Sequence, residues 1–568
     1  MRKKGLLGLF IALLTFTALG FVACEKKTEV KPIPHTHNFT RKQAKDEFIK
    51  TPATCTEKAE YYVSCACGEK SEETFFGNAR LGHTGEDCTR CGNHVVTYGL
   101  EYELSDDCTY CTVTGAGGDY WVEDLVIPAT YQGFPVRAIA DKVFWKMDNI
   151  KSVTLGANIT HMGGYAFYEC ENLETVVFNE QLERLGEWAF ACTNIYEAPL
   201  PDTLQSLGNG TFDRCENLTE ITLPDSVSSL GDYAFNDCTN LKTVTLNDGL
   251  TEIGNSCFSK CSDLEKIAIP DSVTHLGERA FGDCYNLKEL TIGSGIQSIN
   301  EDAFIFCWSL KEVVIPDTVV DVGKNAFRQC DNLAKLTIGK SVERIGEDAF
   351  LFCESLWDIT IRSRSLQVPS EAFLWSGSSK TIRYEGTMQD WFAFTERGGL
   401  LDISVKELYI NGELIAGELR IPNGFETIPS GAFQNCYGIT SLTIPDSVTA
   451  IDDYAFAYCD ISSLTMANSV VEIGEFAFYM CDMSEVVLPN SVTVVQKAAF
   501  NHCKNLKKVK IPVSVTELGD AVFGWCQELD TVIYEGTVAQ WFAIKKGERW
   551  NDLTAVTKVV CSDGEVVL

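Results

Sequence analysis

The residues in this sequence that are best suited to chemistry are cysteines and histidines gathered near the N-terminus. Four of the seven histidines and five cysteines fall between residues 35 and 96: His35, His37, Cys55, Cys65, Cys67, His83, Cys88, Cys91 and His94. Clustered thiolates and imidazoles are typical ligands of tetrahedral zinc. A module this short buries little core and therefore needs a metal ion or disulfide bonds to stabilise it. We expect a structural zinc ion held by Cys65, Cys67, Cys88 and Cys91.

Other arrangements of the same residues stay open. Cys88-x2-Cys91 and Cys108-x2-Cys111 are separated by 16 residues, which also fits a zinc ribbon. This second quartet ranks lower because Cys111 lies in a segment that reads as a strand. His37 and His83 could complete a mixed site. Outside the cytoplasm, disulfides could staple the module instead, or its thiols could stay unpaired.

The rest of the chain offers no set of residues for catalysis. The remaining histidines, His161, His275 and His502, are far apart in sequence and have no companion motif. The sequence contains no Gly-x-Ser-x-Gly elbow, no His-Glu-x-x-His and no phosphate-binding glycine loop. We therefore expect no enzyme. The formal net charge of −32 argues against binding of nucleic acid or anionic lipid, since both need a basic surface.

The N-terminus indicates export. Arg2-Lys3-Lys4 precedes an apolar run from Gly5 to Ala23, as in a signal peptide. Phe21-Val22-Ala23-Cys24 is similar to a bacterial lipobox, with Phe in place of the usual Leu. The resemblance implies that Cys24 becomes the lipid-modified first residue and the only membrane attachment. Plain secretion and a retained membrane anchor are the alternatives.

Most of the remaining chain repeats one unit of 22 or 23 residues, in which a phenylalanine usually stands three residues before a cysteine. The unit Leu287–Cys307 recurs as Leu310–Cys330 and Leu333–Cys353. Two runs of cysteines mark the period: Cys170, Cys192, Cys215, Cys238, Cys261, Cys284, Cys307, Cys330 and Cys353, then Cys436, Cys459, Cys481, Cys503 and Cys526. At Phe190 the cysteine follows after two residues. Because these cysteines share one inward position, we expect buried free thiols rather than disulfides or metal ligands.

Each unit predicts its own local structure. Segments such as Leu290-Thr-Ile292 alternate apolar and polar residues, which indicates a strand with one buried face. Pro-Asp-Ser turns follow many strands, and then comes an Ala-Phe pair that we expect on a short helical turn. Acids before this pair, such as Glu347-Asp348, suit a helix N-terminus. Stacked units would bury one continuous core.

The repeat L-x-x-I-x-I-P-x-S-V-x-x-I-G-x-x-A-F-x-x-C-x-N resembles the BspA-like leucine-rich-repeat family of bacterial surface proteins. The resemblance covers about residues 120 to 535. It implies an α/β leucine-rich-repeat solenoid, a parallel β-sheet with short helical turns, and binding at the bacterial cell surface. The ligand does not carry over. The predicted order is a signal peptide (1–23), a tether (24–34), the Cys/His-rich module (35–96), a first array (97–375), a Trp-bearing cap and junction (376–404), a second array (405–533) and a C-terminal Trp-bearing cap (534–568).

A longer repetition ends both arrays. Tyr384-Glu-Gly-Thr-Met-Gln-Asp-Trp391 matches Tyr534-Glu-Gly-Thr-Val-Ala-Gln-Trp541, and each is followed by an Asn-Gly or Asp-Gly pair (Asn411-Gly412, Asp563-Gly564). Such pairs between apolar residues predict hairpin turns. We interpret these segments as caps. In a sharper alternative, Trp391 and Trp541 form a platform that captures glycans.

Outward strand positions are the expected source of specificity. One outward row is mostly Thr and Val, while residues two positions earlier vary more and include Glu289, Glu312, Lys335 and Asp358. We therefore expect a non-enzymatic surface adhesin or protein-interaction scaffold that binds an extracellular protein through this row. The alternative partner is a glycan at the two Trp-bearing caps.

Overall fold

The computed structural model describes residues 49–51, 58–64, 70–80, 99–116, 122–377, 380–398 and 405–568. Within the predicted Cys/His-rich module it contains a three-stranded sheet of β1 (Ile49–Thr51), β2 (Lys58–Ser64) and β3 (Lys70–Arg80). Strand β2 is central and pairs antiparallel with β1.

From residue 99 onward the chain is a solenoid of parallel strands, which confirms the predicted leucine-rich-repeat fold. It opens with an antiparallel hairpin of β4 (Leu100–Leu104) and β5 (Cys111–Ala116), and β5 pairs parallel with β8 (Phe134–Ile139). The two-residue strand β7 (Thr130–Tyr131) pairs antiparallel with β8. The β4–β5 hairpin covers the start of the first array.

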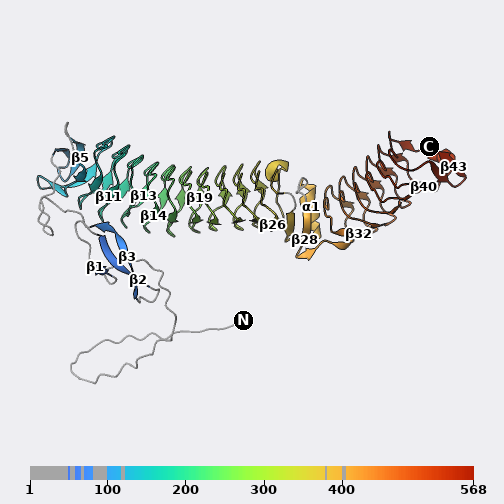
Figure 1. Ribbon diagram of the computed structural model, residues 1–568, viewed down its shortest axis with the longest axis horizontal. Coiled ribbons are helices and arrows are strands. Elements are labelled where there is room, and N and C mark those ends of the chain that lie inside the picture. Colours follow the sequence, from blue (N-terminus) through green and yellow to red (C-terminus); the bar gives the residue numbers. More distant parts are fainter. Residues whose placement is uncertain are drawn as a thin grey trace, which may run out of the picture. The chain divides into compact units, whose positions relative to one another are not determined.

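Most units contribute one strand to each of two stacks, and Figure 1 shows them following one another along the chain. At Glu197 and Gln367 an isolated bridge takes the place of the strand. The long-strand stack of the first array consists of β6 (Asp124–Val126), β9 (Ser152–Thr154), β11 (Thr175–Val177), β14 (Glu220–Thr222), β16 (Thr243–Thr245), β18 (Lys266–Ala268), β20 (Glu289–Thr291), β22 (Glu312–Val314), β24 (Lys335–Ile338), β26 (Asp358–Ile361), β27 (Lys380–Tyr384) and β28 (Val405–Ile410). Its short-strand stack continues from β8 through β10 (His161–Met162), β12 (Arg184–Leu185), β13 (Ser206–Leu207), β15 (Ser229–Leu230), β17 (Glu252–Ile253), β19 (His275–Leu276), β21 (Ser298–Ile299), β23 (Asp321–Val322) and β25 (Arg344–Ile345).

The second array repeats this arrangement. Its long-strand stack contains β30 (Gly417–Arg420), β32 (Ile439–Ile444), β34 (Ser463–Met466), β36 (Glu485–Val487), β38 (Lys508–Ile511), β40 (Thr531–Tyr534) and β42 (Lys558–Cys561). The short-strand stack contains β31 (Thr427–Ile428), β33 (Ala450–Ile451), β35 (Glu472–Ile473), β37 (Val494–Val495), β39 (Glu517–Leu518) and β41 (Lys545–Lys546).

A ladder of phenylalanine rings fills the centre of both arrays. Neighbouring rings lie 4.8–5.7 Å apart between centroids and are nearly parallel, from Phe144 to Phe373 and from Phe433 to Phe523. Parallel strands are spaced by about 4.8 Å, so one ring per unit stacks on the next with a small tilt. These rings are buried, and they join the units into one continuous core.

The cysteine ladder is buried beside the phenylalanines, as predicted. Twelve of its thiols donate an S–H hydrogen bond to the carbonyl of the ladder phenylalanine one unit earlier, as in Cys238 to Phe212 O at 3.1 Å. Loss of water around these thiols raises the pKa of Cys215 and of Cys353 to about 12. All cysteines in the described ranges are free.

The prediction that Cys192 belongs to this ladder is wrong. Thr193 occupies the ladder position in that unit: it is buried, and its hydroxyl donates to Phe190 O at 2.8 Å. Cys192 lies one residue earlier, half-exposed, with a φ of 57°. The ladder position in this unit therefore holds threonine in place of cysteine, and its intervals of 23 residues to Cys170 and 22 residues to Cys215 keep the period of 22 or 23 residues.

The prediction of a short helical turn at the Ala-Phe pair is also wrong for most units. Among the described residues only one unit forms a short 3-10 helix there, Ser370–Phe373. Elsewhere two residues per unit adopt left-handed conformations, such as Tyr233 (φ 59°) and Asp237 (φ 58°). Polar residues before the pair act differently from helix caps, because the Asp232 carboxylate accepts the backbone N–H of Asn255 in the next unit at 2.7 Å.

The matching Trp-bearing segments form caps, as the main interpretation held. Helices α1 (Met388–Glu396) and α2 (Val538–Ala543) each begin with a capping box made by Thr387 or Thr537. After α1, Asn411 and Gly412 have positive φ and form the predicted hairpin between β28 and β29 (Glu413–Leu414). After α2 the register differs: Cys561 pairs with Gly564, so β42 turns through residues 562 and 563 into β43 (Gly564–Val567).

We expect Phe281→Ala to lower the free energy of unfolding by about 3–5 kcal/mol, because it leaves a cavity in a closely packed core. Urea denaturation followed by circular dichroism would measure the change. Phe542→Ala is the matched control, since Phe542 is 68% exposed and its loss should change the midpoint little. Equal effects of the two substitutions would contradict a core role for the ring ladder.

We also expect stability to fall steeply as the pH rises above about 9. The ladder thiols have a higher pKa in the folded protein than in the unfolded chain, so their contribution is complete below the unfolded value of about 8.5 and is lost as the pH rises toward about 12. Urea midpoints at pH 7.5 and pH 10 would show the loss.

Alkylation mapped by mass spectrometry at pH 8 should modify Cys108 and spare Cys238. Labelling of Cys238 in the native protein would contradict the buried ladder.

Candidate binding surfaces

The four charged residues predicted for binding lie on neighbouring strands of the long-strand stack. Glu289, Glu312, Lys335 and Asp358 begin β20, β22, β24 and β26, and the register pairs Glu312 with Lys335 and Lys335 with Asp358. In these strands the next residue is turned toward the core. The structure therefore brings the four residues into one row, which we call the charged row.

The members of the charged row differ in whether their charge is already paired. Lys266 Nζ lies 2.8 Å from Glu289 Oε2, and its hydrogen bond and charge lower the pKa of the Glu289 carboxyl. Arg383 pairs with Asp358 at 3.1 Å. Within the described ranges, neither Glu312 nor Lys335 takes part in an ion pair or a side-chain hydrogen bond. Val314, on the same face of β22, is 46% exposed.

Arg383, Tyr409 and Glu407 form a polar cluster at the Asp358 end of the charged row, and sequence analysis did not identify it. Arg383 on β27 pairs with Asp358 and lies over the ring of Tyr409 on β28, with 4.5 Å between the guanidinium carbon and the ring centroid. Tyr409 donates a hydrogen bond to Glu407 at 3.3 Å. The register pairs Thr360 with Arg383, a separation of 23 residues. The repeat period could therefore have identified Arg383, although the Cys-based pattern ends before it.

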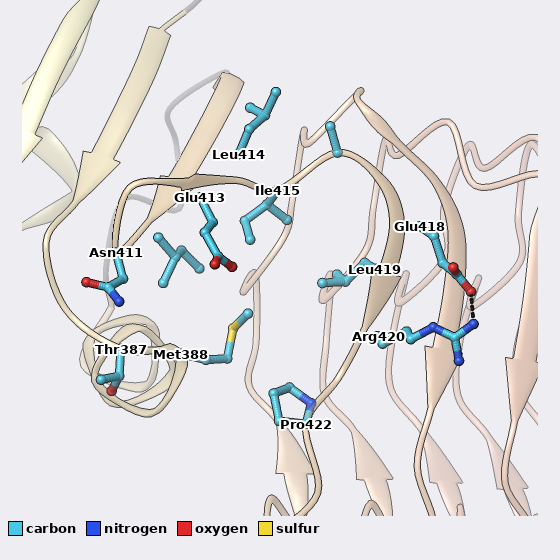
Figure 2. Close-up of a pocket in the computed structure, with 12 residues that line it drawn as sticks. Thr387, Met388, Asn411, Glu413, Leu414, Ile415, Glu418, Leu419, Arg420 and Pro422 are labelled. Atoms are coloured by element: carbon cyan, nitrogen blue, oxygen red, sulfur yellow. Dashed lines mark ion pairs between the residues drawn. The ribbon is translucent and has the colours of Figure 1, made fainter.

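A cavity of about 500 Å³ lies next to the first cap, bounded by the start of α1, the β28–β29 hairpin and β30. Figure 2 shows Met388, Ile415 and Leu419 around it, and a dashed line marks the ion pair of Glu418 with Arg420, at 2.5 Å. Seven of the twelve lining residues are apolar, and Thr387 and Asn411 add uncharged polar groups. Glu413 is the further charged residue in its lining.

The alternative that Trp391 and Trp541 form a glycan platform is wrong. Trp391 is 4% and Trp541 1% exposed. The Trp391 ring lies against Tyr384, and its Nε1 donates to Ala432 O in the second array at 2.9 Å. Trp541 packs against Tyr534 and Trp550 in the same manner. Both side chains close the ends of the core, and neither can contact a ligand.

The residues of the predicted metal and lipid sites lie outside the part of the chain that the structure describes. Cys24, Cys65, Cys67, Cys88 and Cys91 lie outside the described residues, as do His37 and His83. Of the second quartet, Cys108 is exposed and Cys111 is buried in β5, in agreement with its assignment to a strand. No group of His, Cys, Asp or Glu in the part of the chain that the structure describes could hold a metal ion.

The described histidines do not form a catalytic arrangement. His161 and His275 are exposed residues of β10 and β19. His502 bonds Asn501, and burial together with Lys504 lowers the pKa of its imidazole. No helix among the described residues is long and apolar enough to span a membrane.

Several solved structures are similar to this chain. A leucine-rich repeat protein from Bacteroides ovatus is 20% identical, with 82% of this chain and 99% of that chain covered and a TM-score of 0.38. A leucine-rich cell surface protein from Faecalibacterium prausnitzii is 24% identical, with coverages of 79% and 97% and a TM-score of 0.29. The pneumococcal vaccine antigen PcpA is 16% identical, with coverages of 82% and 98% and a TM-score of 0.34.

A search of curated proteins finds no match to the chain. The family model for the BspA-type leucine-rich repeat region matches residues 123–225, 205–334, 297–408 and 418–541. These matches span both arrays and more than half of the sequence, so the chain belongs to the BspA-type leucine-rich repeat family.

Proposed function

We propose that this protein is a non-enzymatic binding protein of the bacterial cell surface that docks an extracellular protein on the charged row. The observation that supports this most is the pair Glu312 and Lys335: they lie on adjacent strands, and neither forms an ion pair with a described residue. Neighbouring Glu289 and Asp358 are held by Lys266 and Arg383. A partner with complementary charges could form ion pairs with Glu312 and Lys335 at the centre of the row, whereas Glu289 and Asp358 are already paired.

The location rests on the N-terminus. An export signal followed by Cys24 supports attachment through a lipid on that cysteine, and the mass of the N-terminal peptide of the mature protein checks it. The family assignment and the acidic surface agree with a repeat protein that faces the outside of the cell. The known role of repeat solenoids as extended binding surfaces supports the same function.

We expect Glu312→Lys and Lys335→Glu each to weaken binding of the protein partner at least tenfold, because each places like charges opposite one another in the complex. Surface plasmon resonance against a panel of extracellular-matrix and bacterial surface proteins, at physiological salt, would first identify the partner. Glu252→Lys is the matched control, since Glu252 is exposed on the short-strand stack. If the control weakens binding as much as Glu312→Lys, the charged row is not the site.

We further propose that Cys65, Cys67, Cys88 and Cys91 hold a structural zinc ion. Elemental analysis of the purified protein should give one zinc per chain. We expect Cys88→Ser with Cys91→Ser to abolish it and Cys108→Ser to leave it unchanged. Loss of zinc in Cys108→Ser and its retention in Cys65→Ser would instead support the quartet with Cys108 and Cys111. Absence of zinc, together with a mass lower by two hydrogens per bridge, would show disulfides.

A further inference from the structure

Six aromatic rings on the turns of the second array form one connected surface, which we call the aromatic patch. Its members are Tyr454, Tyr458, Phe476, Tyr479, His502 and Trp525. Consecutive contacts join all of them, with centroid distances of 4.9–5.6 Å. The Phe476–Tyr479 and Tyr458–Tyr479 pairs are edge to face, whereas Tyr454–Phe476 and His502–Trp525 are stacked. The patch therefore presents ring faces in more than one direction.

The backbone of the turns holds these side chains away from the core. Tyr454, Phe476, Tyr458, His502 and Trp525 all occupy left-handed positions of their units. The core under them is complete without them, since the phenylalanine ladder at Phe456, Phe478, Phe500 and Phe523 is buried separately. Tyr454 is 37% and Trp525 43% exposed.

The first array shows that the fold does not require aromatic residues at these positions. There the same left-handed positions hold polar residues in several units, among them Asp283, Asp302, Asn325 and Asp348, whereas other units have aromatic residues such as Tyr233 and Trp375. These residues take part in ion pairs or hydrogen bonds, as between Arg328 and Asp348 at 3.2 Å. The fold therefore accepts either residue type at these positions, and it does not require the aromatic side chains of the second array.

The aromatic residues near the start of the first array differ in their surroundings. There the ammonium of Lys142 lies over the rings of both Trp145 and Tyr165, and Lys146 lies over Trp145 as well. The chain's own cations thus occupy those ring faces. In the aromatic patch one lysine, Lys497, has its Nζ 5.7 Å from the Phe476 ring.

Formal charges lie at the borders of the aromatic patch. Glu475 and Asp453 are close enough to Tyr454 to help raise the pKa of its phenol, which burial raises most. Lys504 lies near His502. Between these borders, apart from Lys497 over the Phe476 ring, the surface is formed by ring carbons, the tyrosine hydroxyls and the Met480 side chain, which is 36% exposed. A surface of this composition suits an uncharged ligand with both C–H and hydroxyl groups.

We propose that the aromatic patch binds a neutral polysaccharide. The face of an aromatic ring is electron-rich and attracts the weakly positive C–H groups of a sugar ring, while tyrosine hydroxyls can exchange hydrogen bonds with sugar hydroxyls. The rings also extend over four successive solenoid units, with two rings in each of the first two units and one in each of the next two, so a polymer of repeating residues can contact several of them. A second copy of this chain is disfavoured as the ligand, because each copy has a formal net charge of −32 and the two copies would repel each other.

This site is separate from the charged row and binds a different class of ligand, so its test does not depend on the protein partner. The full-length mature protein would be titrated with dextran, mannan and laminarin, with hyaluronan as an anionic comparison, by isothermal titration calorimetry. We expect at least one neutral polymer to bind, with an affinity that rises with oligosaccharide length. Trp525→Ala and Tyr479→Ala should each weaken it at least tenfold.

Trp375→Ala is the matched control, because Trp375 is 74% exposed and lies outside the aromatic patch; it should leave the affinity unchanged. Trp525→Phe should retain more affinity than Trp525→Ala, which separates loss of the ring from loss of folding, and circular dichroism would check each variant. The proposal is overturned if no neutral polysaccharide binds, if only hyaluronan binds, or if Trp375→Ala and Trp525→Ala act alike. Weakened binding of a protein partner by Trp525→Ala, without any polysaccharide binding, would assign the patch to protein recognition.

Discussion

The stacking of one unit on the next at a fixed register is the constraint on which the rest of this structure depends. Parallel strands set a spacing of about 4.8 Å, and every inward side chain must find a partner at that distance in the neighbouring unit. Phenylalanine meets this requirement by ring stacking, and cysteine by donating its thiol hydrogen to the Phe carbonyl one unit earlier. Threonine at position 193 meets it with a hydroxyl that lies 3.3 Å from Cys215 Sγ in the next unit. The core therefore tolerates a change of residue type but not a change of register.

Because the core depends on inward positions, the outward positions are free to carry function. Two separate surfaces use this freedom. On the long strands, Glu312 and Lys335 stand between neighbours whose charges are paired. On the turns of the second array, aromatic residues occupy left-handed positions that polar residues fill in several units of the first array. The same scaffold can thus present a charged surface and an aromatic surface on different sides of its units.

The caps solve the problem that a repeat array has at its ends, where a last unit would expose its core. In both arrays a tyrosine and a tryptophan take this role, and a glycine lies under the tyrosine ring. A Cβ at Gly386 would come within 2.4 Å of the Tyr384 ring, and one at Gly536 within 2.6 Å of the Tyr534 ring. Trp391 also bonds Ala432 O, so the first cap contributes to the start of the second array. This dual use explains why the buried tryptophans cannot act as ligand anchors.

The sequence by itself determined the repeat, the parallel strands, the buried thiols and the alignment of Glu289, Glu312, Lys335 and Asp358. These follow from alternation along a strand and from a constant period, both of which are local properties of the chain. Only the tertiary structure decided that Trp391 is buried, since its partner lies 41 residues away. It also decided that Arg383 neutralises Asp358 and that the turns are left-handed. Such outcomes depend on which side chains of another unit or cap come within contact distance, and no periodic pattern records that.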